Sequence, residues 1–134
     1  MRGSELLTIR AESRNGITIV ALGGELDLAT ASMLREHLVT LEQDGSSTII
    51  LDLRELTFVD SSGLHAFIGA RSDAEANGQR VLLIGAEARV RRLFEITNTL
   101  DMLDESDAVG VLDRFTRSTG DGSRRPDPAQ GTDG

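Results

Sequence analysis

Four consecutive small residues, Asp60, Ser61, Ser62 and Gly63, follow an apolar run and precede a segment with helical spacing. A helix begins with backbone N–H groups that lack intrahelical partners and with a positive partial charge. An acid and two hydroxyls at such a position can cap the helix, supply a nucleophile, bind a phosphate or become phosphorylated. Each of these four roles makes a different demand on the neighbouring residues.

Helix capping makes the smallest demand. Ser61 fits the N-cap position, and Ser62 and Gly63 would then open the first turn. Asp60 either orients Ser61 or caps the helix itself. Gly63 is expected to permit close approach of another backbone segment. On this interpretation the four residues stabilise a helix and do no chemistry.

A nucleophilic serine needs a general base and hydrogen-bond donors for an oxyanion. His65 follows Ser61 by four residues and would lie one turn further along the same side of a helix. No clear carboxylate is available to orient His65, and the stretch is not a G-x-S-x-G elbow. The pattern leaves contact between Ser61 and His65 open but gives little support to a hydrolase.

Phosphate chemistry divides into binding and modification. One glycine without a nearby lysine is a poor phosphate cradle compared with G-x-x-x-x-G-K-[ST]. A phosphate on Ser61 would instead meet free N–H groups and the helix dipole, and would place about −1.5 to −2 charges beside Asp60. A docked partner would feel that repulsion directly. Ser61 is therefore the candidate phosphorylation site, with Ser62 as the fallback.

Composition excludes several other kinds of site. The 134-residue sequence contains no cysteine, which excludes disulfides and thiolate metal sites, and two histidines make a poor basis for zinc binding. Neither a metal nor a cofactor is expected. The net charge of −8 argues against direct nucleic-acid binding. No apolar run approaches the ~20 residues of a membrane span, and no secretory signal is recognisable, so a cytoplasmic protein is expected.

Strands are expected on both sides of this motif. Two β-branched segments, at about 6–11 and 17–22, predict a hairpin around the polar turn "ESRNG". The turn-rich "GGELDLAT" follows. "STIILDL" and "RVLLIGA" are runs of consecutive apolar residues, which are typical of strands buried on both faces.

Helical spacing recurs between these strands, at about 30–45, 62–77 and 87–97 and more weakly at 105–115. Strands joined through helices indicate parallel pairing. The sequence therefore predicts an α/β fold with a mixed β-sheet, in which a parallel core carries an N-terminal antiparallel hairpin strand and is flanked by about four α-helices. One domain is expected at 5–116. Residues 117–134 hold both prolines and no large apolar side chain, which predicts a disordered tail.

Three segments resemble a known family. "LTFVDSSGL" (Leu56–Leu64) resembles the signature of the bacterial anti-sigma factor antagonists, small proteins made of a STAS domain. "GGELDLATA" (Gly23–Ala31) is similar to their G-E-L-D loop, and "ARVRRLFEITNTLDML" (Ala88–Leu103) to their third helix and the following turn. The resemblance covers about 6–115, and the three segments together are specific, whereas D-S-S-G alone would not be.

The resemblance implies a STAS-type fold and partner switching without catalysis. In this family the unphosphorylated protein binds an anti-sigma factor, usually a serine kinase with a GHKL-type ATP site, and thereby frees a sigma factor for RNA polymerase. The kinase phosphorylates the first serine of D-S-S-G, here Ser61, which breaks the complex, and a PP2C-type phosphatase reverses the modification. Such a protein regulates transcription, for example in the stress response or sporulation, and is expected to be a monomer or weak dimer without a membrane or nucleic-acid partner.

The resemblance also makes Asp27 a residue that positions the phosphoacceptor or the partner. From its place before a helix alone, Asp27 is equally an acid favoured by the helix dipole. His65 stands where the family often has a small residue and is expected at the rim of the contact. The alternative function is a STAS scaffold in a larger signalling assembly without an anti-sigma partner. The residues expected to bind the partner or support the phosphosite are Asp27, Asp60, Ser62, Gly63, Leu64 and His65.

Overall fold

A mixed four-stranded sheet organises the computed structural model, which describes residues 7–104. The strand order is β1-β2-β3-β4, with β1 antiparallel to β2 and the other neighbours parallel, as the sequence predicts. The final helix, the domain boundary and the tail that the sequence predicts lie outside the described residues. The elements are β1 (Leu7–Arg14), β2 (Ile17–Leu26), α1 (Ala31–Gln43), β3 (Thr48–Val59), α2 (Ser61–Ala76), β4 (Arg80–Ile84), α3 (Ala88–Ile96) and the short 3-10 helix η2 (Leu100–Met102).

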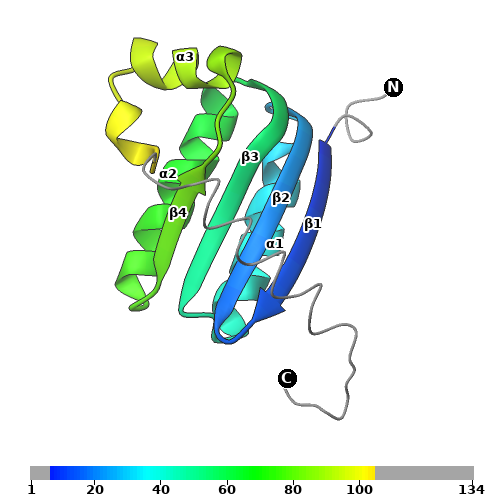
Figure 1. Cartoon of the computed structure of the whole chain (residues 1–134), viewed down its shortest axis with the longest axis vertical. Coiled ribbons are helices and arrows are strands. Elements are labelled where there is room, and N and C mark those ends of the chain that lie inside the picture. The colour runs from blue at the N-terminus through cyan, green and yellow to red at the C-terminus, as the bar shows by residue number, and fades with distance from the viewer. Residues whose placement is uncertain (1–6, 105–134) are drawn as a thin grey trace. The chain divides into compact units, whose positions relative to one another are not determined.

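Helices α1 and α2 lie side by side on one face of the sheet (Figure 1). Helix α1 buries Leu34, Leu38 and Leu41 along one side, which is the stripe that the helical spacing predicts. Helix α3 is anchored through Phe94, whose ring stacks on Phe67 of α2 with centroids 6.2 Å apart. No helix within residues 7–104 is long and apolar enough to cross a bilayer.

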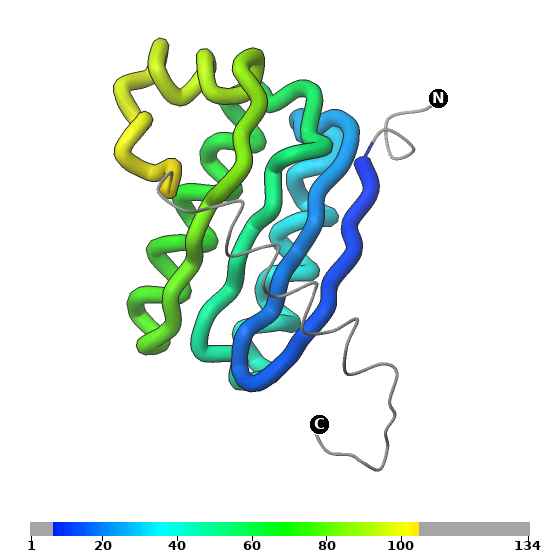
Figure 2. Tube along the Cα trace, viewed as in Figure 1, coloured from blue at the N-terminus to red at the C-terminus, as the bar shows by residue number. Residues whose placement is uncertain are grey.

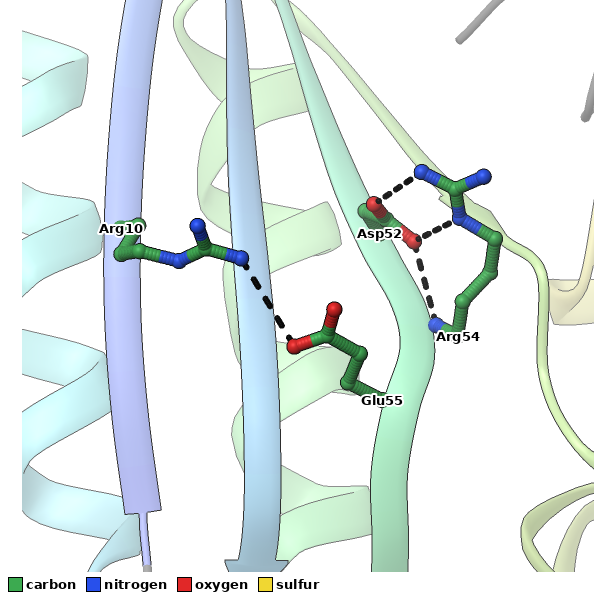
Figure 3. Close-up of polar contacts among 4 residues, drawn as sticks. All are labelled: Arg10, Asp52, Arg54 and Glu55. Carbon is green, nitrogen blue, oxygen red and sulfur yellow. Dashed lines mark hydrogen bonds and ion pairs between the residues drawn. The ribbon is translucent and has the colours of Figure 1, made fainter.

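The opposite face of the sheet carries two charged pairs (Figure 3). Ile50 and Asp52 are buried on this face of β3, so the strand is buried on both faces, as its apolar run indicates. Arg54 holds Asp52 with Nε 3.0 Å from Oδ1 and Nη2 3.1 Å from Oδ2. Arg10 lies 3.6 Å from Glu55, and both side chains are exposed. The Asp52–Arg54 pair therefore satisfies a buried carboxylate, whereas the Arg10–Glu55 pair is at the surface.

The first hairpin is tighter than the sequence pattern suggests. β1 continues to Arg14, which pairs with Ile17, so only Asn15 and Gly16 form the loop. Both have positive φ, 54° and 82°. A two-residue turn with two positive φ angles matches the twist of antiparallel strands, and Asn-Gly is the pair that favours it.

The segment expected as a turn after "ITIVAL" is instead strand. β2 runs on to Leu26, with register shifts between Ala21 and Gly23 and between Gly24 and Glu25. Gly24 has φ of 90°, which a glycine adopts at little cost. The two glycines thus allow bulges within the strand and do not end it.

Candidate functional site

Two loops meet at the sheet edge where β2 and β3 end. Leu26 and Val59 are parallel register partners, and the Asp60 N–H donates to the Leu26 carbonyl oxygen at 3.1 Å. The Cα trace shows the β2–α1 and β3–α2 connections beside each other at this edge (Figure 2). Asp27 and Asp60, which follow these partners in the chain, therefore belong to neighbouring loops, as parallel pairing requires.

Asp60 caps helix α2. Its Oδ1 accepts hydrogen bonds from the N–H groups of Ser62, at 2.9 Å, and Gly63, at 3.1 Å. The expectation that Ser61 is the N-cap is therefore wrong, because Asp60 has the extended backbone of a cap and Ser61 is already helical. Aspartate and serine cap about equally well, so residue type alone does not decide between adjacent positions.

Ser61 lies at the first helical position, exposed and without a hydrogen bond from its hydroxyl to any described residue. His65 is also exposed, and no hydrogen bond joins it to Ser61 within residues 7–104. Among the described residues, none is hydrogen-bonded to the Ser61 hydroxyl as a general base would be. A phosphate on Ser61 would meet fewer free amides than the sequence suggests, since Asp60 already accepts from those of Ser62 and Gly63 and the Ser61 N–H is left.

Gly63 allows α2 to begin directly against the ends of β2 and β3. A Cβ atom there would lie 2.8 Å from Leu26 Cγ and 2.9 Å from Val59 Cγ1. Leu64 beside it is only 4% exposed. The partner contact expected of Leu64 does not fit this burial, because its side chain belongs to the core. Gly63 and Leu64 therefore fix the position of the Ser61 turn from inside.

Asp27 organises the loop before α1. Its Oδ1 accepts from the N–H groups of Ala29, at 3.0 Å, and Thr30, at 3.1 Å. Thr30 Oγ1 accepts the Asp27 N–H at 2.9 Å and lies within hydrogen-bond distance of both the Glu25 carbonyl oxygen and Asp27 Oδ1. The carboxylate thus holds its own loop in shape beside the Ser61 turn.

The sequence motifs did not single out two exposed apolar side chains near this turn. Leu28, next to Asp27, is 78% exposed, and Phe58, two residues before Asp60, is 43% exposed. The available signal for Leu28 was a second leucine, after the buried Leu26, inside the turn-rich "GGELDLAT". Each lies two residues from one end of the Leu26–Val59 pair or from Asp60, so both belong to the segments that meet at this edge.

Removing the Asp60 carboxylate is expected to lower the free energy of unfolding by about 1 kcal/mol, because two backbone N–H groups lose their acceptor. The variant to test is Asp60→Ala, measured by urea denaturation. Asp60→Asn is the matched control, since asparagine caps about as well as aspartate. Equal losses in both variants would show that the carboxylate matters for a reason other than the cap.

A shallow groove of about 80 Å³ lies between α1 and α2. Small residues of α2 line one side and apolar residues of α1 the other, with charged residues among them. The lining residues are Arg35, Leu38, Val39, Glu42, Ala66, Gly69, Ala70 and Asp73.

The negative charge of Glu42 in this groove is unfavourable for the stability of the folded state. Burial raises the pKa of its carboxyl above the ordinary value of 4.5, and the negative charge of Asp73 raises it further. The folded state therefore binds a proton at Glu42 more tightly than the unfolded chain does, so ionisation of Glu42 costs stability.

Glu42→Gln is expected to raise the free energy of unfolding at about pH 7, where the ionised carboxylate opposes folding. The gain should shrink as the pH falls below the ordinary value of 4.5, where Glu42 is protonated in both states. Denaturation of the variant and the unmodified protein at both pH values measures this difference. Glu36→Gln, an exposed carboxylate elsewhere on α1, controls for the loss of one charge. A gain that is the same at both pH values would contradict the assignment.

Comparisons with known proteins agree in family. Residues 8–113 match the model of the STAS domain. An anti-sigma-B factor antagonist of Staphylococcus aureus is 32% identical over 105 residues, which cover 78% of this chain and 97% of that protein. Its counterpart in Staphylococcus epidermidis is 30% identical over the same share of both chains.

Solved structures of the same kind share the fold. The unphosphorylated form of the anti-sigma factor antagonist SpoIIAA superposes with a TM-score of 0.68 at 25% identity, over 81% of this chain and 96% of that one. The phosphorylated form of SpoIIAA, a Bacillus cell fate determinant, gives 0.63 at 24% identity over 81% and 99%. With the D-S-S-G turn at the sheet edge, these matches place the chain in the STAS domain family, among its anti-sigma factor antagonists.

Proposed function

We propose that this protein is the phosphorylation-controlled component of a partner-switching system in the bacterial cytoplasm. Its unphosphorylated form binds an anti-sigma factor that is also a serine kinase, and binding releases the sigma factor. Phosphorylation of Ser61 by that kinase ends the complex, and a PP2C-type phosphatase restores it. The protein is then a substrate and a binding partner, with no catalysis of its own.

The exposed hydroxyl of Ser61 at the start of α2 is the observation that carries this proposal. It makes no hydrogen bond to a described residue, so a kinase can reach it without breaking one. Ser62 is half-buried, and its N–H donates to Asp60, which makes it the less accessible hydroxyl. Ser61 is therefore the phosphoacceptor, and Ser62 remains the fallback.

A phosphate at Ser61 would weaken the binding of a partner that is acidic or closely packed at this edge of the sheet. Asp60 and Asp27 already supply carboxylates to the two neighbouring loops. The phosphate would add about −1.5 to −2 charges there, while the amides of Ser62 and Gly63 already donate to Asp60. Leu28 and Phe58 would supply apolar contact area around the charged centre, as in the core of a typical interface.

Intact-mass spectrometry after incubation with ATP and the anti-sigma kinases of the source cell tests the proposal. One added phosphate is expected, mapped to Ser61 by fragmentation. It should be lost in Ser61→Ala and kept in Ser62→Ala. Binding of an anti-sigma factor without any phosphate transfer would leave a constitutive antagonist and overturn the switch.

A further inference from the structure

The groove between α1 and α2 holds charges that the rest of the described chain does not neutralise. Glu42 and Asp73 line it and repel each other, and neither forms an ion pair within residues 7–104. Arg35 also lines the groove without such a pair, two turns earlier on α1. A cation placed between the two carboxylates would relieve their repulsion.

The floor of the groove is left open by a glycine that packing does not require. A Cβ atom on Gly69 would meet nothing within 4 Å, although glycine inside a helix weakens it relative to alanine. Val39 faces it from α1 and is 46% exposed. An apolar side chain from another protein would find both space and apolar surface here.

An exposed stripe of α2 leads from the Ser61 turn to the groove. His65, Ile68, Gly69 and Ser72 are all exposed and follow Ser61 at helical spacing towards Asp73. Ser61 and Asp73 are separated by a little over three turns, about 18 Å along the axis. A standard interface of about 800 Å² per partner is wide enough to cover both.

We infer that the α1–α2 groove is a second contact for the anti-sigma factor, which inserts an apolar side chain over Gly69 and a lysine or arginine between Glu42 and Asp73. This inference depends on the proposed function, because it assigns the same partner to a second surface. The exposed stripe that joins the groove to the Ser61 turn assigns it to the same partner. Charge sets the orientation of that partner: the carboxylates lie at the end of the groove away from Ser61 and Arg35 lies nearer to it, so the partner's cation enters at the far end.

Titration calorimetry of the full chain against the anti-sigma factor tests the groove with two variants. Asp73→Arg removes the expected cation site, and Gly69→Leu fills the floor with a side chain whose Cβ meets nothing within 4 Å. Each is expected to weaken binding at least tenfold. Glu36→Arg makes the same charge change on an exposed position of α1 outside the groove and is expected to leave affinity unchanged. The melting temperature of each variant verifies that it is folded.

The outcomes separate the two proposals. If the unmodified protein binds no anti-sigma factor, the proposed function fails and the groove has no assigned partner. If it binds, and folded Asp73→Arg and Gly69→Leu proteins bind equally well, the function stands and the groove inference is wrong. Self-association of the unmodified protein that Asp73→Arg abolishes, with anti-sigma binding intact, would assign the groove to a second copy of this chain and also overturn the inference.

Discussion

Ser61→Asp is expected to weaken binding of the anti-sigma factor more than a hundredfold. A negative charge at the exposed start of α2 would be desolvated in the complex, beside Asp60 and close to the loop of Asp27. A penalty of about 3 kcal/mol corresponds to that loss of affinity. Titration calorimetry with the unphosphorylated and phosphorylated proteins in parallel measures the effect, and the phosphorylated protein should bind at least as weakly.

Two further substitutions at the same position separate charge from shape. Ser61→Asn has nearly the volume of aspartate without its charge, and it should retain most of the affinity. Ser61→Ala should bind constitutively and resist phosphorylation. Equal affinities for the serine, alanine and aspartate forms would refute control by charge, whereas a loss in Ser61→Asn as large as that in Ser61→Asp would assign the effect to packing.

Gly63→Ala is expected to destabilise the fold by about 1–3 kcal/mol, the usual cost of overpacking a core. The new Cβ would lie within 2.9 Å of side-chain carbons of Leu26 and Val59, which hold the ends of the two central strands. Relief requires α2 to move away from the sheet edge, which shifts the Ser61 turn as well. Urea denaturation measures the loss of stability, and binding of the anti-sigma factor should weaken with it.

The same substitution at Gly69, six residues further along α2, should change stability in the opposite direction. At Gly69 a Cβ meets nothing within 4 Å, so Gly69→Ala gains the helix propensity of alanine, about 0.5–1 kcal/mol. The two variants share one chemistry and one helix and differ only in surroundings. If Gly63→Ala were stabilising, the ends of β2 and β3 would be able to move to make room for the new Cβ. The close packing at Gly63 would then not fix the position of the Ser61 turn.

The order of the elements could be predicted from the sequence because burial imposes a pattern on each of them. β3 is buried on both faces, and its sequence is a run of consecutive apolar residues. Helix α1 is buried on one side only, and its leucines recur at helical spacing. The bulged end of β2 could not be predicted in this way. Its glycines are typical of turns in sequence, and only pairing with β3 makes them part of a strand.

Details of the site depend on contacts that local sequence does not contain. Whether Asp60 or Ser61 caps α2 is decided by where β3 ends, and that is fixed by the bond from the Asp60 N–H to Leu26. The groove needs α1 and α2 to be side by side. Gln79 is a similar case, since its amide donates to the carbonyl oxygens of Ser46 and Glu42, far away in sequence.

The Asp60 cap on α2 affects what phosphorylation of Ser61 would change in the protein. Because the Asp60 carboxylate already accepts the amide hydrogens of Ser62 and Gly63, a phosphate attached to Ser61 can bind the Ser61 N–H without rearranging the capped turn. The phosphorylated and unphosphorylated proteins would then share one backbone conformation and differ in charge at Ser61. Phosphorylation and dephosphorylation could then alternate repeatedly, since neither the kinase nor the phosphatase would have to wait for a conformational change of the chain.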